Sequence, residues 1–168
     1  QSKVKIAPKV MLILSGGLSS FVEKIENPVV IKAEDIPHFP QPTAEGHSGK
    51  MIFGKVGDLS LVALQGRFHY YEGHEMAKVI FPVFVINALG AKTLIVTNAV
   101  GGINKDFKSG DIMMITDHIN QMGVNPLRGI ANLRSENQFT DMTDAYSKKF
   151  HSLAKESAKA AGVELKEG

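Results

Sequence analysis

The sequence contains no cysteine in 168 residues. This absence excludes a disulfide framework and a zinc site built on thiolates. It is compatible with a reducing compartment, where proteins rarely form disulfides. We therefore expect a cytoplasmic protein. The N-terminal residues also lack the charged and then apolar pattern of a secretion signal. Because the sequence begins without Met, we expect it to start inside a longer reading frame.

An excess of charge of one sign is absent as well. Lys and Arg total 19 against 17 Asp and Glu, for a net charge of +2. This balance gives no broad field to attract nucleic acid or an anionic membrane, so anion binding must be local. The longest apolar run, residues 79–86, contains Pro82 and is far shorter than the ~20 residues that span a bilayer. Neither a nucleic acid nor a membrane is an expected partner.

Strand-like and helix-like segments alternate along the chain, and 43% of the residues are hydrophobic, which is enough for a sizeable core. Residues 9–14 form a short apolar run typical of a strand buried on both faces of a parallel sheet. The expected elements that follow are a hairpin over 51–56 and 59–65, a helix over 75–89 with a kink or early break at Pro82, strands over 94–97 and 111–116, a long loop over 123–142, a helix over 144–161 and a strand starting near 163. This pattern predicts a single α/β domain over residues 1–168 with a mixed β-sheet flanked by helices.

The densest polar motif, Gly66-Arg67-Phe68-His69-Tyr70-Tyr71-Glu72-Gly73, directly follows a predicted strand. An Arg offers a planar fork of donors to a phosphate, and a His two residues further on can lie on the same side of an extended segment. These features favour a phosphate site. The alternative is a solvated strand end whose charges have no ligand.

Three further segments could bind an anion, although each is weak evidence alone. Small residues over 15–20 separate a strand from an expected helix, where backbone N–H groups can converge on an anion. The Gly-rich loop over 97–102 follows another strand, at the edge where open α/β sheets bind ligands. His47 lies between glycines in the segment 45–49. The alternatives are tight turns for the two loops and a hydrogen-bonded structural role for His47.

Five segments occur in an order and at a spacing that resemble one family: 43–49, 65–73, 96–104, 117–120 and 125–129. Together they are similar to the trimeric purine nucleoside phosphorylases, a branch that includes the methylthioadenosine phosphorylases. The resemblance covers the chain from Lys9 onward, and the Gly66–Gly73 motif is its most specific part.

The resemblance implies roles for individual residues. Arg67 and His69 would bind phosphate. In the phosphorolysis that the resemblance implies, His69 and Glu72 are the expected catalytic residues, with Glu72 orienting His69; the alternative for Glu72 is a solvated carboxylate. The family's first loop carries a Ser hydroxyl on the phosphate where this sequence has Gly16, so Ser15 or Ser19 would supply that group. The full expected set is phosphate binding by Ser15, His47, Arg67, His69 and the backbone at Ala99, and ribose binding by Tyr71 and by Phe139 from a neighbouring subunit.

The activity that the resemblance implies is phosphorolysis of a purine nucleoside by inorganic phosphate, the co-substrate, with no metal or organic cofactor, in a homotrimer. The family continues with a second half that grips the purine, so we expect a chain truncated before that half. Two alternatives follow: a non-catalytic fragment or degraded relative that keeps the phosphate cradle and the subunit interface, or a methylthioadenosine phosphorylase. An unrelated anion-binding α/β module would require five ordered motifs to coincide.

Overall fold

The computed structural model describes residues 4–41, 49–129 and 139–168. The chain folds as two compact units, Gln1–Val100 and Gly101–Gly168. That residues 1–168 form a single domain stays a prediction. In the described part of the chain, no helix combines the length and the apolar character that crossing a membrane requires.

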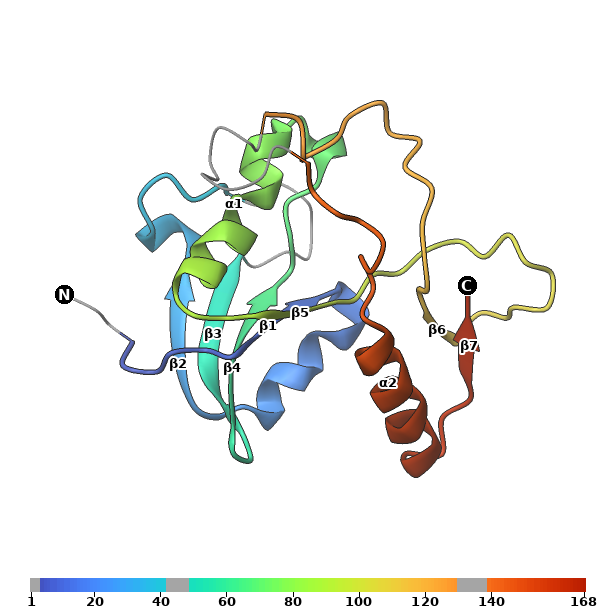
Figure 1. Ribbon diagram of the computed structural model, residues 1–168. Coiled ribbons are helices and arrows are strands. Elements are labelled where there is room, and N and C mark those ends of the chain that lie inside the picture. The colour runs from blue at the N-terminus through green and yellow to red at the C-terminus, as the bar shows by residue number, and fades with distance from the viewer. Residues whose placement is uncertain (1–3, 42–48, 130–138) are drawn as a thin grey trace. The chain divides into compact units, whose positions relative to one another are not determined.

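The first unit is built on one five-stranded sheet (Figure 1). Its strands are β1 (Val10–Leu14), β2 (Glu26–Lys32), β3 (Lys50–Val56), β4 (Leu59–Gln65) and β5 (Thr93–Val96), in the spatial order β2-β3-β4-β1-β5. β2, β3 and β4 pair antiparallel, whereas β4, β1 and β5 pair parallel. The expected α/β fold with a mixed sheet is therefore confirmed.

The two faces of this sheet are covered by different helices. Because side chains alternate across a strand, Met11 and Ile13 of β1 face one side and Leu12 and Leu14 the other. The first face packs against side chains near and within α1 (Met76–Ala88), including buried Ile86. The second face packs against the 3₁₀-helix η1 (Gly16–Lys24), so each half of the core has its own cover.

Two local expectations for this unit need correction. α1 does not break at Pro82 but continues through it as one helix. Proline removes one backbone N–H and costs a helix about 3 kcal/mol, but Pro82 is fully buried in a helix of high apolar content. β2 was not expected, because Asn27 and Pro28 interrupt its apolar pattern. It lies at the sheet edge with a register shift between Glu26 and Val29, where proline is tolerated.

The second unit contains a short parallel pair of strands and one helix. β6 (Ile112–Met114) pairs with β7 (Leu165–Glu167), and α2 (Lys148–Ala160) lies between them in sequence. Strands were expected at both places. The helix begins after Ser147, which is later than the expected start near Asp144.

Candidate functional site

Three of the expected anion-binding segments, those that follow β1, β4 and β5, begin at the same end of the sheet. β1 lies between β4 and β5, and all three run parallel with closely matched ends: Leu14 is opposite Gln65, and Ile13 is opposite Val96. The carboxyl ends of neighbouring parallel strands form the usual ligand-binding edge of an open α/β sheet. The segments that begin at Ser15, Gly66 and Thr97 therefore start side by side.

Thr97 joins two of these strand ends. Its hydroxyl accepts a hydrogen bond from the backbone N–H of Ser15 at 2.9 Å and donates to the carbonyl of Ile13 at 3.1 Å. Its own backbone N–H donates to the same carbonyl at 2.9 Å. The start of the first loop is thus fixed to the end of β5 by contacts between residues 82 positions apart in sequence.

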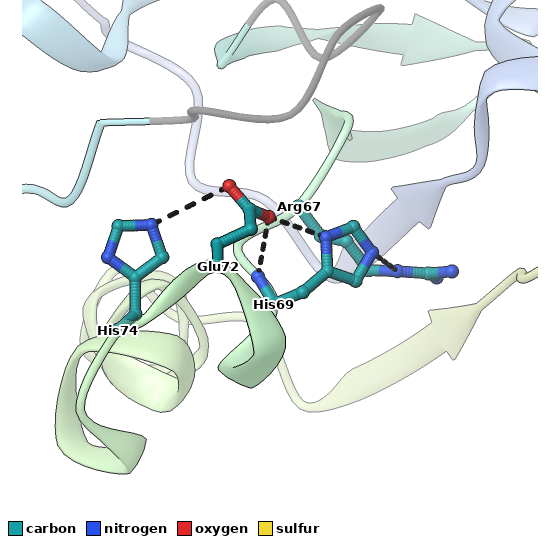
Figure 2. A network of polar contacts seen from close by, with 4 residues as sticks. All are labelled: Arg67, His69, Glu72 and His74. Carbon is teal, nitrogen blue, oxygen red and sulfur yellow. Dashed lines mark hydrogen bonds and ion pairs between the residues drawn. The ribbon is translucent and has the colours of Figure 1, made fainter.

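The side chain of Arg67 connects the end of β4 to the ends of β1 and β5. Nη1 donates to the carbonyl oxygen of Thr97, and Nε donates to Nε2 of His69 at 3.0 Å. Two residues apart on extended backbone, Arg67 and His69 project to the same side, as the sequence predicts (Figure 2). The guanidinium therefore lies at the carboxyl ends of β4 and β5 with its planar fork held in place.

Glu72 lies behind His69 and is almost completely buried, with 3% of its side chain exposed. The 3₁₀-helix η3 (Tyr70–Glu72) turns the chain so that Glu72 reaches back to its own N-terminus. Oε1 accepts the backbone N–H of His69 at 2.9 Å and lies 2.6 Å from ring Nδ1 of the same residue. The first of these contacts is half of a capping box, in which a carboxylate at the third position satisfies the N-cap amide.

These contacts orient the ring of His69. Nδ1 faces the Glu72 carboxylate, whose oxygens accept hydrogen bonds. Nε2 faces the guanidinium and accepts from Nε of Arg67. The two ring nitrogens are therefore held toward different partners.

Tyr71 places an aromatic surface beside His69, the partner of Arg67. Its ring stacks on that of His69 with centroids 4.7 Å apart and an interplanar angle of 23°, and the residue is 78% exposed. Such a surface suits an amphipathic ligand that contacts both solvent and the polar pair.

The other expected site residues differ in where they lie. Ala99 is exposed near the end of the first unit, two residues beyond the Thr97 carbonyl that Arg67 contacts. Phe139 belongs to the second unit and is 85% exposed. His47 lies outside the described residues. Ser15 is buried and takes part through its backbone N–H and carbonyl, the latter accepting from Leu18 N–H.

Sequence reasoning missed two residues of the network. Thr97 was noted only as part of a Gly-rich loop, although a hydroxyl residue directly after a parallel strand is a signal for this edge of the sheet. His74 follows the last glycine of the motif and faces Glu72, with Nε2 3.7 Å from Oε2. His74 is only two residues from Glu72 in the sequence, and this spacing alone does not predict a contact between the two side chains.

The comparisons with known proteins identify the class that carries this fold and site. A family model described as the phosphorylase superfamily matches residues 11–168. The chain belongs to this superfamily.

Among curated proteins, the chain is 51% identical over 162 residues to purine nucleoside phosphorylase 1 of Bacillus subtilis, covering 96% of this chain and 60% of the relative. It is 44% identical to the purine nucleoside phosphorylase of Rattus norvegicus, covering 100% of this chain and 60% of the relative. The resemblance to purine nucleoside phosphorylases that the motifs indicated is confirmed. The chain spans about 60% of the length of these relatives.

Solved structures agree with this result. The crystal structure of Schistosoma mansoni purine nucleoside phosphorylase with adenosine matches at a TM-score of 0.90 and 34% identity, covering 98% of this chain and 60% of that chain. A purine nucleoside phosphorylase in complex with ribose-1-phosphate matches at a TM-score of 0.90 and 35% identity, covering 98% and 63%.

Proposed function

We propose that this chain carries the phosphate- and ribose-binding part of a purine nucleoside phosphorylase, which converts a purine nucleoside and inorganic phosphate into free base and ribose 1-phosphate. The observation that supports this most directly is the Arg67–His69–Glu72 network at the carboxyl ends of β4, β1 and β5. The relatives support the substrate class, since the two matches to purine nucleoside phosphorylases cover 96% and 100% of this chain.

In the proposed reaction, a phosphate oxygen forms a bond to the anomeric carbon of the ribose as the bond from that carbon to the purine nitrogen breaks. The electron pair of the broken bond leaves with the purine, which must gain a proton or a hydrogen bond. The Arg67 fork suits two phosphate oxygens, and its delocalised charge holds the dianion against the cationic sugar of the transition state. Catalysis then consists mainly of orientation and electrostatic stabilisation, and no metal or organic cofactor is required.

Phosphate binding requires a change in the proton pattern at His69. To donate to a phosphate oxygen, Nε2 must carry a proton, which it cannot do while it accepts from Arg67 Nε. Binding therefore replaces the Arg67–His69 hydrogen bond by two contacts to phosphate, and Nε2 of His69 takes its proton from an incoming H2PO4− or from solvent while Nδ1 still faces Glu72. The buried carboxylate balances the charge of the imidazolium.

The remaining roles follow the same proposal. Tyr71, stacked on His69, would form the ribose side of the site, with Phe139 reaching a neighbouring subunit of a homotrimer. Ser15, His47 and the backbone at Ala99 would complete the phosphate contacts. A cytoplasmic salvage enzyme fits these substrates. The alternatives are a methylthioadenosine phosphorylase and a non-catalytic chain that keeps only the phosphate cradle.

The deciding experiment compares the full-length protein that contains this chain with the 168-residue chain alone. With inosine and phosphate, the full-length protein should release hypoxanthine and ribose 1-phosphate in equal amounts, and release should saturate with phosphate. The chain alone should bind phosphate weakly and show little or no phosphorolysis. Base release that is independent of phosphate would contradict the proposal, and a strong preference for methylthioadenosine over inosine would select that alternative.

A further inference from the structure

A second histidine faces the buried carboxylate of the site from the side opposite His69. Gly73 ends η3 in the left-handed conformation, with φ of 88°, which turns the chain so that His74 returns toward Glu72. Only 15% of the His74 side chain is exposed. Its ring meets the ring of buried Phe68 edge to face, with centroids 6.0 Å apart and an interplanar angle of 88°.

The two oxygens of Glu72 face different partners, as Figure 2 shows. Oε1 contacts both the backbone N–H and Nδ1 of His69, whereas Oε2 lies 3.7 Å from Nε2 of His74. That nitrogen is buried and forms no hydrogen bond with the described residues. A nearly buried carboxylate is costly to hold without close partners, so a ring N–H at Nε2 of His74 adds to the contacts that favour this orientation of the group.

We propose that His74 is a positioning residue for phosphorolysis, an inference that rests on the proposed function of Arg67 and His69. With Nε2–H facing Oε2, His74 fixes the rotation of the Glu72 carboxylate. Oε1 then stays on Nδ1 of His69, and this contact holds the ring so that Nε2 points to the place where Arg67 and, in the proposed reaction, phosphate meet it. His74 touches no substrate in this scheme and acts only through Glu72.

Packing against Phe68 alone would also explain a buried His74, so the test must separate ring packing from the donor. His74→Phe keeps an aromatic ring against Phe68 and removes the donor. His74→Gln removes the ring but places an amide N–H near the position of Nε2. Glu75→Gln is the matched control, because Glu75 is exposed, adjacent to His74, and its side chain makes no cap hydrogen bond.

The variants are made in the full-length protein, and two quantities are measured. The first is the KM for phosphate and the kcat at saturating phosphate and inosine. We expect His74→Phe to raise the phosphate KM roughly tenfold with little change in kcat, because loss of one contact to a buried charged group weakens binding of the ligand held by His69. His74→Gln should recover most of the wild-type value, and Glu75→Gln should equal the wild type.

The second quantity is the ¹⁵N chemical shift of the two His69 ring nitrogens, which reports the tautomer independently of turnover. The wild type and His74→Gln should show His69 protonated at Nδ1, and His74→Phe should show a mixture of tautomers. If His74→Phe does not fold, His74→Asn takes its place, since its amide is too short to reach Oε2, and should behave as His74→Phe is expected to.

The inference is overturned if the donor-lacking variant keeps both the wild-type phosphate KM and the wild-type His69 tautomer, or if His74→Gln is as impaired as that variant. These results differ from a failure of the proposed function. In that case the wild-type protein would show no phosphate-dependent base release, while the His69 shifts would still report whether His74 positions Glu72.

Discussion

Arg67 and His69 are hydrogen-bonded to each other, with Nε of the guanidinium donating to Nε2 of the imidazole at 3.0 Å. In the proposed function these two nitrogens bind one phosphate, so each of them now has the other as partner where it would have a phosphate oxygen. The Glu72 carboxylate behind His69 and the Thr97 carbonyl beside Arg67 keep both groups close to that position. Exchange of partners therefore needs only small movements of the side chains.

The substitution Arg67→Lys tests whether the fork, rather than the charge, binds phosphate. Lysine keeps the charge but cannot donate along two parallel directions or contact Thr97 and a phosphate from one rigid plane. The expected cost is about 1.5–3 kcal/mol, or roughly ten- to a hundredfold in kcat/KM for phosphate. Steady-state kinetics in the full-length protein measure it. Lys55→Arg is the control and should leave the phosphate kinetics unchanged, because Lys55 lies near the turn between β3 and β4, at the opposite end of β4 from Arg67. An unchanged phosphate KM in Arg67→Lys would show that the Gly66–Gly73 segment is structural.

The double variant Arg67→Lys with His69→Ala should lose less than the sum of the two single losses. Two residues that hold one ligand are coupled, and contacts of this kind show interaction energies of about 0.5–3 kcal/mol in double-mutant cycles. The measurement is kcat/KM for phosphate in all four proteins of the cycle. Strict additivity would mean that the two side chains serve separate ligands.

Gly16→Ser should strengthen phosphate binding. The resemblance places a serine hydroxyl at this position, and a Cβ added at Gly16 would meet no atom within 4 Å. A neutral hydrogen bond contributes about 0.5–1.5 kcal/mol, so the phosphate KM should fall roughly two- to tenfold. Gly17→Ser is the matched control, because position 17 is equally open. An equal effect of both variants would argue against a specific contact at position 16.

Gly54→Ala should destabilise the first unit without touching the site. A Cβ at this position of β3 would lie 2.4 Å from Cγ2 of Ile25 and 2.6 Å from the backbone oxygen of Glu26. The backbone must shift to relieve this overlap, at a cost of about 1–3 kcal/mol. Chemical denaturation gives the free energy of unfolding, and Gly17→Ala, which adds the same methyl group in open space, is the reference. Equal stability of the two variants would mean that the backbone near Ile25 and Glu26 moves away from Gly54 of β3 at no cost in free energy.

Strands with continuous apolar runs or a clear turn signal could be predicted from the sequence. The run at 9–14 and the hairpin around Gly57-Asp58 correspond to β1, β3 and β4. β2 could not be predicted from the sequence. It is an edge strand, and an edge strand tolerates a proline and a bulge that local pattern rules treat as a loop. The continuity of α1 through Pro82 depends on tertiary burial, which a local rule for proline does not include.

In the site, the sequence predicted the residues with obvious chemistry. It did not predict the residues from other positions that contact them. Arg67, His69 and Glu72 lie within six residues, so their mutual contacts follow from local geometry. The role of Thr97 depends on the parallel register of β1 and β5, which brings residues 15 and 97 together. The position of His74 depends on the left-handed turn at Gly73, whose effect on a side chain is not visible in residue spacing.

The hydrogen bond between Ser15 and Thr97 also bears on how the protein is made. Both sheet neighbours of β1, β4 and β5, follow it in the chain, and parallel pairs of this kind close long loops before they gain stability. During translation, β1 lacks its neighbour β4 until Gln65 has left the ribosome and its neighbour β5 until Val96 has left it. Over that interval its apolar side chains are open to chaperones and to other nascent chains.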